Sequence, residues 1–170
     1  MTKRKVRVMN RTTLLIMGEG EHDKAFLNHM RGIYYNRNSG VKITLDFSSG
    51  GSPHDIIKDT VKKTKHTDYD KRFILMDEDI AIKQQDYDIA KKEDIVILQS
   101  VPVCLEGMLL TILGEYIVSM SNAQKCKSKL HPKLSGNPVN PKSYHPLFKK
   151  QILDETNHTT IQELQKILNH

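Results

Sequence analysis

Acidic residues follow three separate apolar runs of this chain, at points where their carboxylates could meet. Glu19 comes after the first run, Asp77 and Asp79 come after a later run, and Glu106 comes shortly after the last. Carboxylates held close together repel one another unless a cation neutralises them. Carboxylate oxygens are also the preferred ligands of Mg²⁺ and Mn²⁺. The pattern therefore predicts a divalent-cation site, whose remaining water ligands a phosphate could displace.

Each of these acids also has an ordinary structural explanation. Acids at 19–23 could favour the start of a helix through its dipole, and the D-E-D sequence at 77–79 could form a capped turn. Glu106 lies in V-C-L-E-G-M-L-L, where a buried carboxylate needs a partner. We interpret the acids as a metal site because three strand ends supply them together.

Apolar patterning predicts the strands that these acids follow. Continuous apolar runs are typical of strands buried on both faces, and strict alternation is typical of a half-exposed strand. Four segments show one pattern or the other: 13–17, 41–47, 72–76 and 95–98.

Helices are predicted between and after the strands. Their approximate ranges are 21–36, 53–63 (with Ser52 as N-cap and Pro53 in the first turn), 84–93 and 105–119. This alternation predicts an α/β fold with a mostly parallel four-stranded sheet and flanking helices.

Ligands of such sheets bind beyond the carboxyl ends of the strands, which is where the acids fall. On extended backbone Asp77 and Asp79 would face the same side, and Glu78 would point away. Gly18 and Gly20 would turn the chain tightly and leave Glu19 at the rim.

The C-terminal part of the chain is predicted to be a basic extension of a single domain spanning residues 1–170. The domain core would cover about 13–120 and the extension about 121–170. Four of the six prolines fall in 131–146, which predicts a loop, and T-I-Q-E at 160–163 has the pattern of a capping box before a last helix.

Charge is distributed unevenly along the chain, which carries a formal net charge of +6. No Asp or Glu occurs from Tyr116 to Leu153, and a second basic cluster occupies residues 3–7. The lysines of the C-terminal region are Lys125, Lys127, Lys129, Lys133, Lys142, Lys149 and Lys150. We interpret them as a clamp for a nucleic-acid backbone, the alternative being a solvated lysine-rich surface.

Composition argues against several other classes of protein. No apolar run approaches the roughly 20 residues that span a bilayer, and no signal peptide is recognisable, so a cytoplasmic protein without membrane contact is expected. Cys104 and Cys126 form no C-x-x-C pair, which argues against a structural zinc site or disulfide framework. The chain has no P-loop and no G-x-S-x-G elbow, and its eight histidines are scattered.

Three motifs in order resemble the Toprim domain: E-G-E-H-D-K-A-F after the first strand, D-x-D after the third, and L-Q-S-V-P-V-C-L-E-G-M-L-L. The closer resemblance is to the RloB-like family of stand-alone Toprim proteins, related to OLD-type nucleases, and it covers about 13–115. It implies a Rossmann-like Toprim fold and a Mg²⁺- or Mn²⁺-dependent nuclease or phosphodiesterase acting on DNA or RNA, with phage defence as the implied setting.

The same resemblance implies roles for individual residues. Glu19, Asp77 and Asp79 would be catalytic, with Glu19 near the scissile phosphate as general acid or base and the aspartates binding Mg²⁺. Asp23 and Glu106 would help to bind a second metal, completing a ligand set of all five acids. Lys24 would neutralise phosphate charge, in addition to the C-terminal lysines.

Two other functions remain open at this point. The chain could be a non-catalytic module that binds Mg²⁺ together with nucleic acid. Such a module could instead bind a partner protein, a separately encoded ATPase. It could also be a small RNA-processing phosphodiesterase resembling the maturases of 5S ribosomal RNA. Nucleotidyl transfer, as in primases, fits least because no second, template-reading domain is visible.

Overall fold

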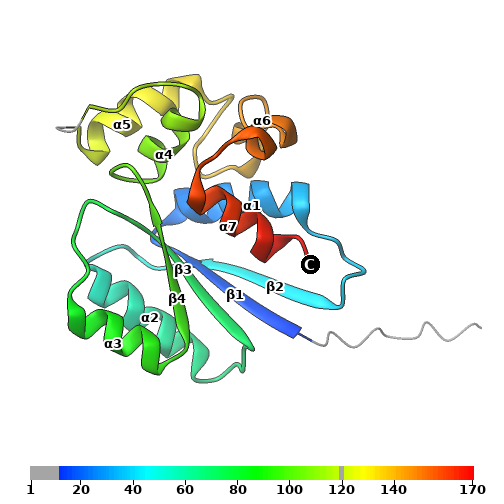
Figure 1. Ribbon diagram of the computed structural model, residues 1–170, viewed down its shortest axis with the longest axis vertical. Helices are drawn as coiled ribbons and strands as arrows, with labels where there is room; N and C mark the ends of the chain where they lie inside the picture. Colours follow the sequence, from blue (N-terminus) through cyan, green and yellow to red (C-terminus); the bar gives the residue numbers. More distant parts are fainter. Residues whose placement is uncertain (1–11, 119–120) are drawn as a thin grey trace, which may run out of the picture.

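The computed structural model describes residues 12–118 and 121–170, and these form an α/β fold around one sheet. Its four strands are all parallel and lie in the order β2-β1-β3-β4 (Figure 1). The strands are β1 (Thr12–Gly18), β2 (Val41–Phe47), β3 (Lys71–Asp77) and β4 (Ile95–Ser100). The predicted α/β class and the four strands are confirmed. The basic cluster at residues 3–7 lies outside the described residues.

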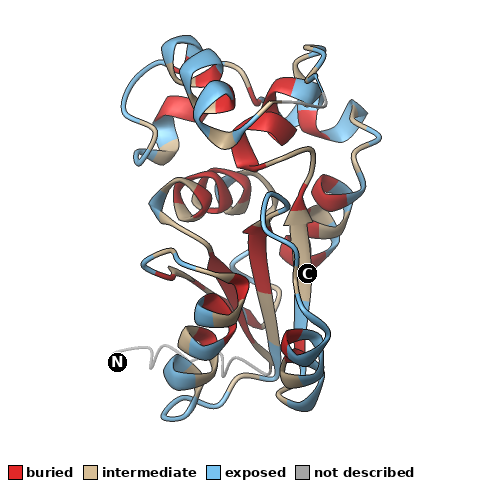
Figure 2. Cartoon of the chain, turned by 90° about the vertical axis from the view of Figure 1, so that its left-hand side faces the viewer, coloured by how far each residue is buried: buried red, intermediate tan, exposed pale blue. Residues whose placement is uncertain are grey.

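The central strands are buried on both faces, as their continuous apolar runs predict. In β1, Leu14 and Ile16 belong to one hydrophobic cluster, whereas Leu15 and Met17 belong to a second. Successive side chains of a strand point to opposite faces, so each face of the sheet has its own core. Figure 2 shows buried residues along the strands and on the inward sides of the surrounding helices.

Two helices cover each face of the sheet. On one face α2 (Pro53–Thr64) and α3 (Gln84–Lys92) pack against the cluster that contains Leu15. On the other face α1 (Glu21–Tyr34) shares the larger cluster with α7 (Thr159–Leu168), which lies against both α1 and β4. The three crossovers between strands place a single helix on this second face. The C-terminal helix α7 therefore completes the cover.

The remaining helices lie beyond the carboxyl ends of the strands (Figure 1). They are α4 (Leu105–Ile112), α5 (Ala123–Leu130), α6 (Lys150–Glu155) and two 3₁₀ helices, η1 (His131–Lys133) and η2 (Pro141–Tyr144). The 3₁₀ helices and turns of 131–146 agree with the irregular segment predicted there. Neither α5 nor α6 was predicted.

Two predicted helix boundaries are wrong. The helix expected to reach about residue 119 ends at Ile112, followed by Gly114 with a positive φ of 84°. The capping box expected at 160–163 is absent, because α7 already begins at Thr159 after His158. Thr160 instead donates its hydroxyl proton to the carbonyl of Gln99 in β4, at 2.7 Å. The N-terminus of α2 does follow the prediction, since Ser52 accepts from the backbone N–H of Asp55.

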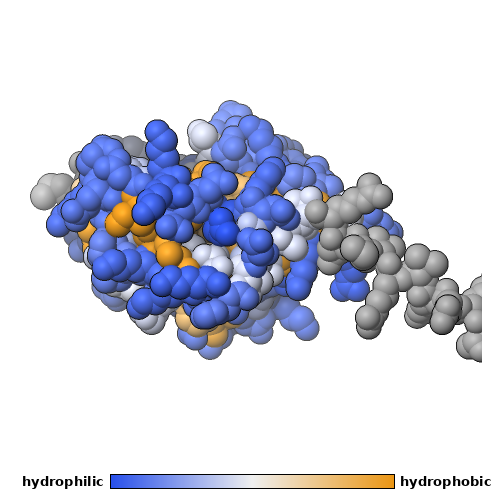
Figure 3. Space-filling view, turned by 90° about the horizontal axis from the view of Figure 1, so that it is seen from below, coloured by the Kyte–Doolittle hydropathy of each residue, from blue (hydrophilic) through white to orange (hydrophobic). Residues whose placement is uncertain are grey.

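The lower face of the molecule is mostly polar (Figure 3). Figure 3 shows the molecule from below, with hydrophilic side chains over most of that face and hydrophobic ones in small groups between them. Within the described part of the chain, no helix combines the length and apolar character needed to span a bilayer.

Candidate functional site

An open cavity of about 430 Å³ lies at the carboxyl edge of the sheet. The chain passes from β1 to β2 on one side, whereas β3 lies on the other side of β1, so the strand order reverses between β1 and β3. Ligands of open parallel sheets bind at such a reversal. Residues 47–50 form one wall, and four acids that were predicted as ligands also line the cavity: Glu19, Asp23, Asp77 and Glu106.

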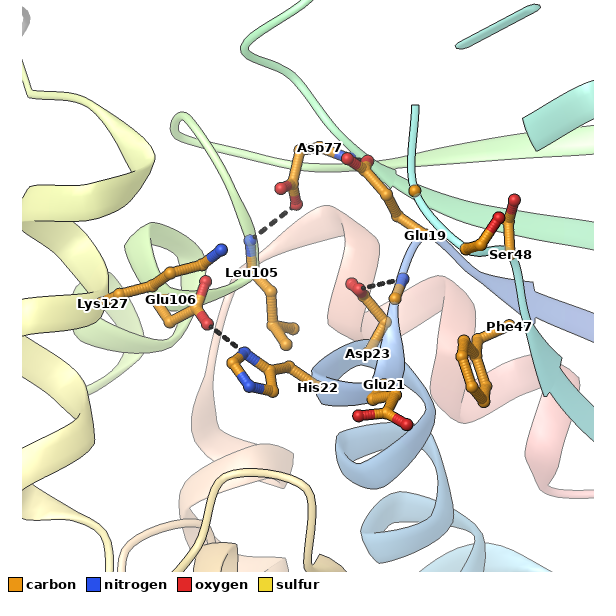
Figure 4. A pocket seen from close by; sticks show the side chains of 13 residues that line it. Glu19, Glu21, His22, Asp23, Phe47, Ser48, Asp77, Leu105, Glu106 and Lys127 are labelled. Atoms are coloured by element: carbon orange, nitrogen blue, oxygen red, sulfur yellow. Dashed lines mark hydrogen bonds and ion pairs between the residues drawn. The ribbon is translucent and has the colours of Figure 1, made fainter. Parts of the chain in front are cut away.

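Backbone N–H groups fix two of these carboxylates. Glu19 Oε2 accepts a hydrogen bond from the N–H of Asp77 at 2.8 Å, and Asp77 Oδ1 accepts one from the N–H of Leu105 at 3.0 Å. Figure 4 shows these side chains around one common space, which Asp23 and Glu106 also border. The ends of β1 and β3 and the start of α4 are thereby connected through the site.

Asp23 reaches the cavity from the first turn of α1. Its Oδ2 accepts from the N–H of Gly20 at 3.0 Å, while its Oδ1 is buried and has no hydrogen-bond partner among the described residues. A Cβ at Gly18 would lie 2.6 Å from the Cβ of Asp23, so only glycine lets α1 approach the end of β1 this closely. Gly20 has extended backbone. Gly18 therefore permits close packing, in addition to the bend that the chain makes at residues 19–20 between β1 and α1.

Burial raises the pKa of three of the carboxylates. The pKa of Glu19 is raised, that of Asp23 is raised well above its ordinary value, and that of Asp77 is raised to about 7. Neighbouring carboxylates add to the effect, since the charge of Asp77 raises the pKa of Asp23 and the charge of Glu19 raises that of Asp77. The three groups resist simultaneous ionisation, and a bound cation would relieve this repulsion.

Asp79 lies outside the cavity lining. It is exposed and borders a neighbouring hollow together with Glu78, Pro102 and Val103. Strand β3 ends at Asp77, so the alternation of a strand does not extend to residue 79. Its charge nevertheless raises the pKa of both Glu19 and Asp77.

Glu78 holds the loop that follows β4. Its Oε2 accepts from the N–H of Val103 at 3.1 Å, and its own N–H donates to the Val103 carbonyl, also at 3.1 Å. Val103 has a φ of 68°, which is strained for a β-branched residue. Glu78 thus secures the loop that presents the N–H of Leu105 to Asp77.

Glu106 is buried and meets two histidines that were not predicted as site residues. Its Oε1 lies 3.0 Å from His22 Nδ1 and 3.1 Å from His131 Nε2. Burial opposes ionisation of Glu106, but hydrogen bonds from His22, from the backbone and from His131, together with the charge of Lys127, outweigh it, and its pKa is lowered to about 2. The ligand atoms of the three side chains lie within 4.8 Å of one another, so the group could hold a metal ion.

Sequence reasoning missed the histidines because no local motif marks them. His22 and His131 lie 84 and 25 residues from Glu106 in the chain. The only signal was the position of His22 inside E-G-E-H-D, between two acids that were singled out.

Lys127 is the one predicted phosphate-binding lysine in the cavity lining of the described residues. It extends from α5 toward Glu106 (Figure 4), and its charge lowers the pKa of both Glu19 and Glu106. Lys24 lies nearby, with its Nζ 3.9 Å from Asp46 Oδ1 and 5.3 Å from the centre of the Phe47 ring.

Other lysines of the basic region form ion pairs. Lys129 and Lys133 both bind Glu115, at 3.4 and 2.9 Å, and Lys150 binds Asp154. Lys125 and Lys149 are exposed. Of the C-terminal lysines predicted to bind nucleic acid, Lys127 is thus placed at the acidic cavity and at least three others are partly neutralised.

Comparison of the chain with protein-family models, with curated proteins and with solved structures finds no match. Functional inference therefore depends on the geometry of the cavity.

Proposed function

We propose that this cavity is the active site of a Mg²⁺- or Mn²⁺-dependent nuclease or phosphodiesterase of Toprim type, acting on nucleic acid. The observation that carries the proposal is the convergence of Glu19, Asp23 and Asp77 from the ends of β1 and β3 and the start of α1, each with a raised pKa. A Rossmann-like Toprim identity of the α/β fold, and a substrate-binding role for the basic region from residue 121 onward, are parts of the same proposal.

The donor atoms of these side chains are of the type that a hard divalent cation prefers. Glu19, Asp23 and Asp77 offer only oxygen, which Mg²⁺ prefers over nitrogen or sulfur. Asp23 Oδ1, buried and without a hydrogen-bond partner among the described residues, is the kind of group that is costly to leave unpaired. A cation held by these three side chains would bind Asp23 Oδ1, and its charge would favour the ionised forms of Glu19 and Asp77. Asp79 would then act through its charge, from outside the ligand set.

In this proposal, different residues of the cavity have different roles in phosphodiester cleavage. A bound cation would supply Lewis-acid stabilisation of charge on a phosphate. Glu19, whose raised pKa brings its carboxyl closer to neutral pH, is suited to exchange a proton with the attacking or leaving oxygen. Asp77 is held in place by the N–H of Leu105, and Lys127 brings a positive charge to the same space for the substrate phosphate.

Cleavage assays with single-carboxylate variants test this proposal. Purified protein is incubated with Mg²⁺ or Mn²⁺ and with single- and double-stranded DNA and RNA. We expect cleavage by the wild type, and a loss of at least about 100-fold in Glu19→Gln and in Asp77→Asn, since each removes a charge that acts in the transition state. Asp88→Asn, which changes an exposed carboxylate of α3, is the control and should cleave like the wild type.

The same samples separate the enzyme from a binding module. If none of the substrates is cleaved above the level seen with Asp77→Asn, the enzyme proposal fails. Binding measured at several salt concentrations then decides whether the cavity takes nucleic acid at all. Each phosphate neutralised contributes a slope of about −0.9 to the double-logarithmic salt dependence on duplex DNA. A binding module without cleavage would show such a slope, reduced in Lys127→Gln.

A further inference from the structure

At one corner of the cavity, His22 and Glu106 of the lining meet His131, which lies just outside the lining, so nitrogen ligands come together with oxygen there. His22 projects from the first turn of α1, Glu106 from the first turn of α4, and His131 from η1. Three elements that are far apart in the chain therefore bring two imidazoles to one buried carboxylate. Nothing in the proposed phosphodiester chemistry makes use of the two imidazoles.

The spacing of the three ligand atoms suits a metal ion with short bonds. Bonds of about 2.0–2.2 Å to nitrogen and oxygen, at tetrahedral angles, place neighbouring ligand atoms about 3.3 Å apart. Glu106 Oε1 lies 3.0 Å from His22 Nδ1 and 3.1 Å from His131 Nε2. Small side-chain rotations would lengthen these two oxygen–nitrogen distances to about the value that a tetrahedral metal ion requires.

Both imidazoles approach the same carboxylate oxygen instead of taking one oxygen each. Their rings are nearly perpendicular, at 84°, with centroids 5.0 Å apart, so they do not stack. The side chains of His22 and His131 are 31% and 28% exposed, whereas that of Glu106 is 3% exposed. The carboxylate is thus fixed in the protein, and both histidines can be reached by an ion entering from solvent.

A second buried carboxylate in the molecule contacts one histidine instead of two, and it provides a comparison. His54 Nδ1 lies 2.6 Å from Asp86 Oδ1, with side-chain exposures of 35% and 3% that nearly equal those of His22 and Glu106. This pair has a single imidazole and belongs to no group of three ligands among the described residues. The added imidazole of His131 is what distinguishes the cavity group from an ordinary ion pair.

We propose that His22, Glu106 and His131 bind a divalent transition metal, with Zn²⁺ as the chemical type. Two imidazoles and one carboxylate are a donor set of catalytic zinc sites, which leave a further coordination position for water or substrate. Imidazole nitrogen favours Zn²⁺ and its neighbours in the first transition row, whereas Mg²⁺ favours oxygen. The site therefore selects a different ion from the one expected at Glu19, Asp23 and Asp77.

Lys127 brings a positive charge close to this site. The charge of Lys127 lowers the pKa of Glu106, and the side chain lines the same cavity. Lys127 would therefore repel a cation bound by the two histidines and Glu106. Removing that charge should tighten binding. Lys127→Gln is accordingly expected to bind the metal more tightly than the wild type.

Titration of the chelator-treated, full-length protein with Co²⁺ tests the site, because Co²⁺ substitutes for Zn²⁺ and absorbs visible light when protein ligands bind it. We expect one equivalent to give an absorption band that Zn²⁺ removes and that a large excess of Mg²⁺ leaves in place. His22→Ala and His131→Ala should each weaken binding by at least about tenfold, the lower end of what even indirect disruption of a metal site costs. His54→Ala is the matched control and should titrate like the wild type.

The outcomes are decisive in either direction. No band in the wild type, or equal binding by the wild type, His22→Ala and His131→Ala, would overturn the site. Circular dichroism checks that each variant is folded, and Glu106→Gln, which preserves size, replaces a histidine variant that fails to fold. Asp77→Asn should keep the Co²⁺ band even where it abolishes Mg²⁺-dependent cleavage. Failure of the nuclease proposal therefore leaves this test intact.

Discussion

The carboxylates of one cavity are held in two different electrostatic states. Glu19, Asp23 and Asp77 have raised pKa values because they are buried beside one another. Glu106 is similarly buried, yet its pKa is lowered to about 2 by the two histidines that contact it. As the pH rises, the first group therefore holds its protons longer than Glu106 does. A cation binding to the first group must displace those protons, so its affinity should rise with pH.

The raised pKa of Asp77 predicts how the stability of the metal-free protein changes with pH. The folded-state pKa of about 7 lies above the ordinary value of 3.8, so the folded state binds more protons than the unfolded state between these values. Stability due to this group is present below about pH 4 and is lost as the pH rises toward 7. We expect Asp77→Asn, whose amide oxygen can still accept from Leu105, to be more stable than the wild type by about 2 kcal/mol near pH 8.

Urea unfolding in the presence of a chelator measures this difference at about pH 5 and pH 8. The gain should be larger at the higher pH, and added Mg²⁺ should stabilise the wild type more than the variant. A variant that is less stable than the wild type at the higher pH would show that Asp77 is not held in a repulsive environment.

Sequence patterns predicted the part of the site that lies at the ends of strands, but not the part that helix packing brings there. Glu19 and Asp77 could be placed together because each directly follows an apolar run, and parallel strands bring their carboxyl ends to one edge. Asp79 was expected inside because strand alternation was extended past the residue where β3 ends. His22 and His131 could not be paired with Glu106, since only the packing of α1, α4 and η1 brings them together.

Helix α4 packs closely against the loop that precedes it. A Cβ at Gly107 would lie 2.2 Å from the carbonyl oxygen of Pro102, so this turn of the helix touches the backbone of the preceding loop. That loop carries Val103, which Glu78 secures, and leads to the N–H of Leu105, which binds Asp77. The close approach of helix and loop therefore fixes one wall of the site.

Substitution of Gly107 tests this close contact. Gly107→Ala should destabilise the protein by about 2–3 kcal/mol, because the backbone of Pro102 cannot yield without moving the loop. The control is Gly32→Ala in α1, where a Cβ meets nothing within 4 Å; it should be neutral or stabilise by up to about 1 kcal/mol through helix propensity. Thermal unfolding of both variants gives the comparison. Equal stability of the two would contradict the tight packing of α4.

The elements that sequence analysis predicted correctly are those with a strong apolar pattern. The strands have continuous or alternating runs, and α2 has its serine cap, proline and acidic first turn. The missed helices bury very little. In α5 the buried residues are Cys126 and Leu130, set among lysines, and in α6 the buried residue is Leu153. Such short helices depend on contacts with α4 and the larger core, which a local pattern does not reveal.

At the scale of the whole molecule, the C-terminal region serves the core as well as the surface. Residues 121–170 were expected to be a basic extension, yet α7 closes one face of the sheet beside α1. The same region supplies Lys127 to the cavity lining, and it supplies His131 to the group that His22 and Glu106 form beside the cavity. Folding of the sheet and assembly of the site are thereby coupled, because the segment that covers β4 is continuous with the segment that borders the cavity.

Truncation within this region tests the coupling. The α7 side chains Ile161, Leu164 and Leu168 are fully buried, and Ile167 is 8% exposed. Burying each contributes about 1.5–3 kcal/mol, which together approaches the whole stability of about 5–15 kcal/mol typical of a domain. A chain ending at Asn157 should therefore lose cooperative unfolding. The control is a chain ending at Leu168, which omits two exposed residues and should unfold like the full chain. Cooperative unfolding of the shorter chain, measured by circular dichroism, would show that the rest of the chain folds without α7.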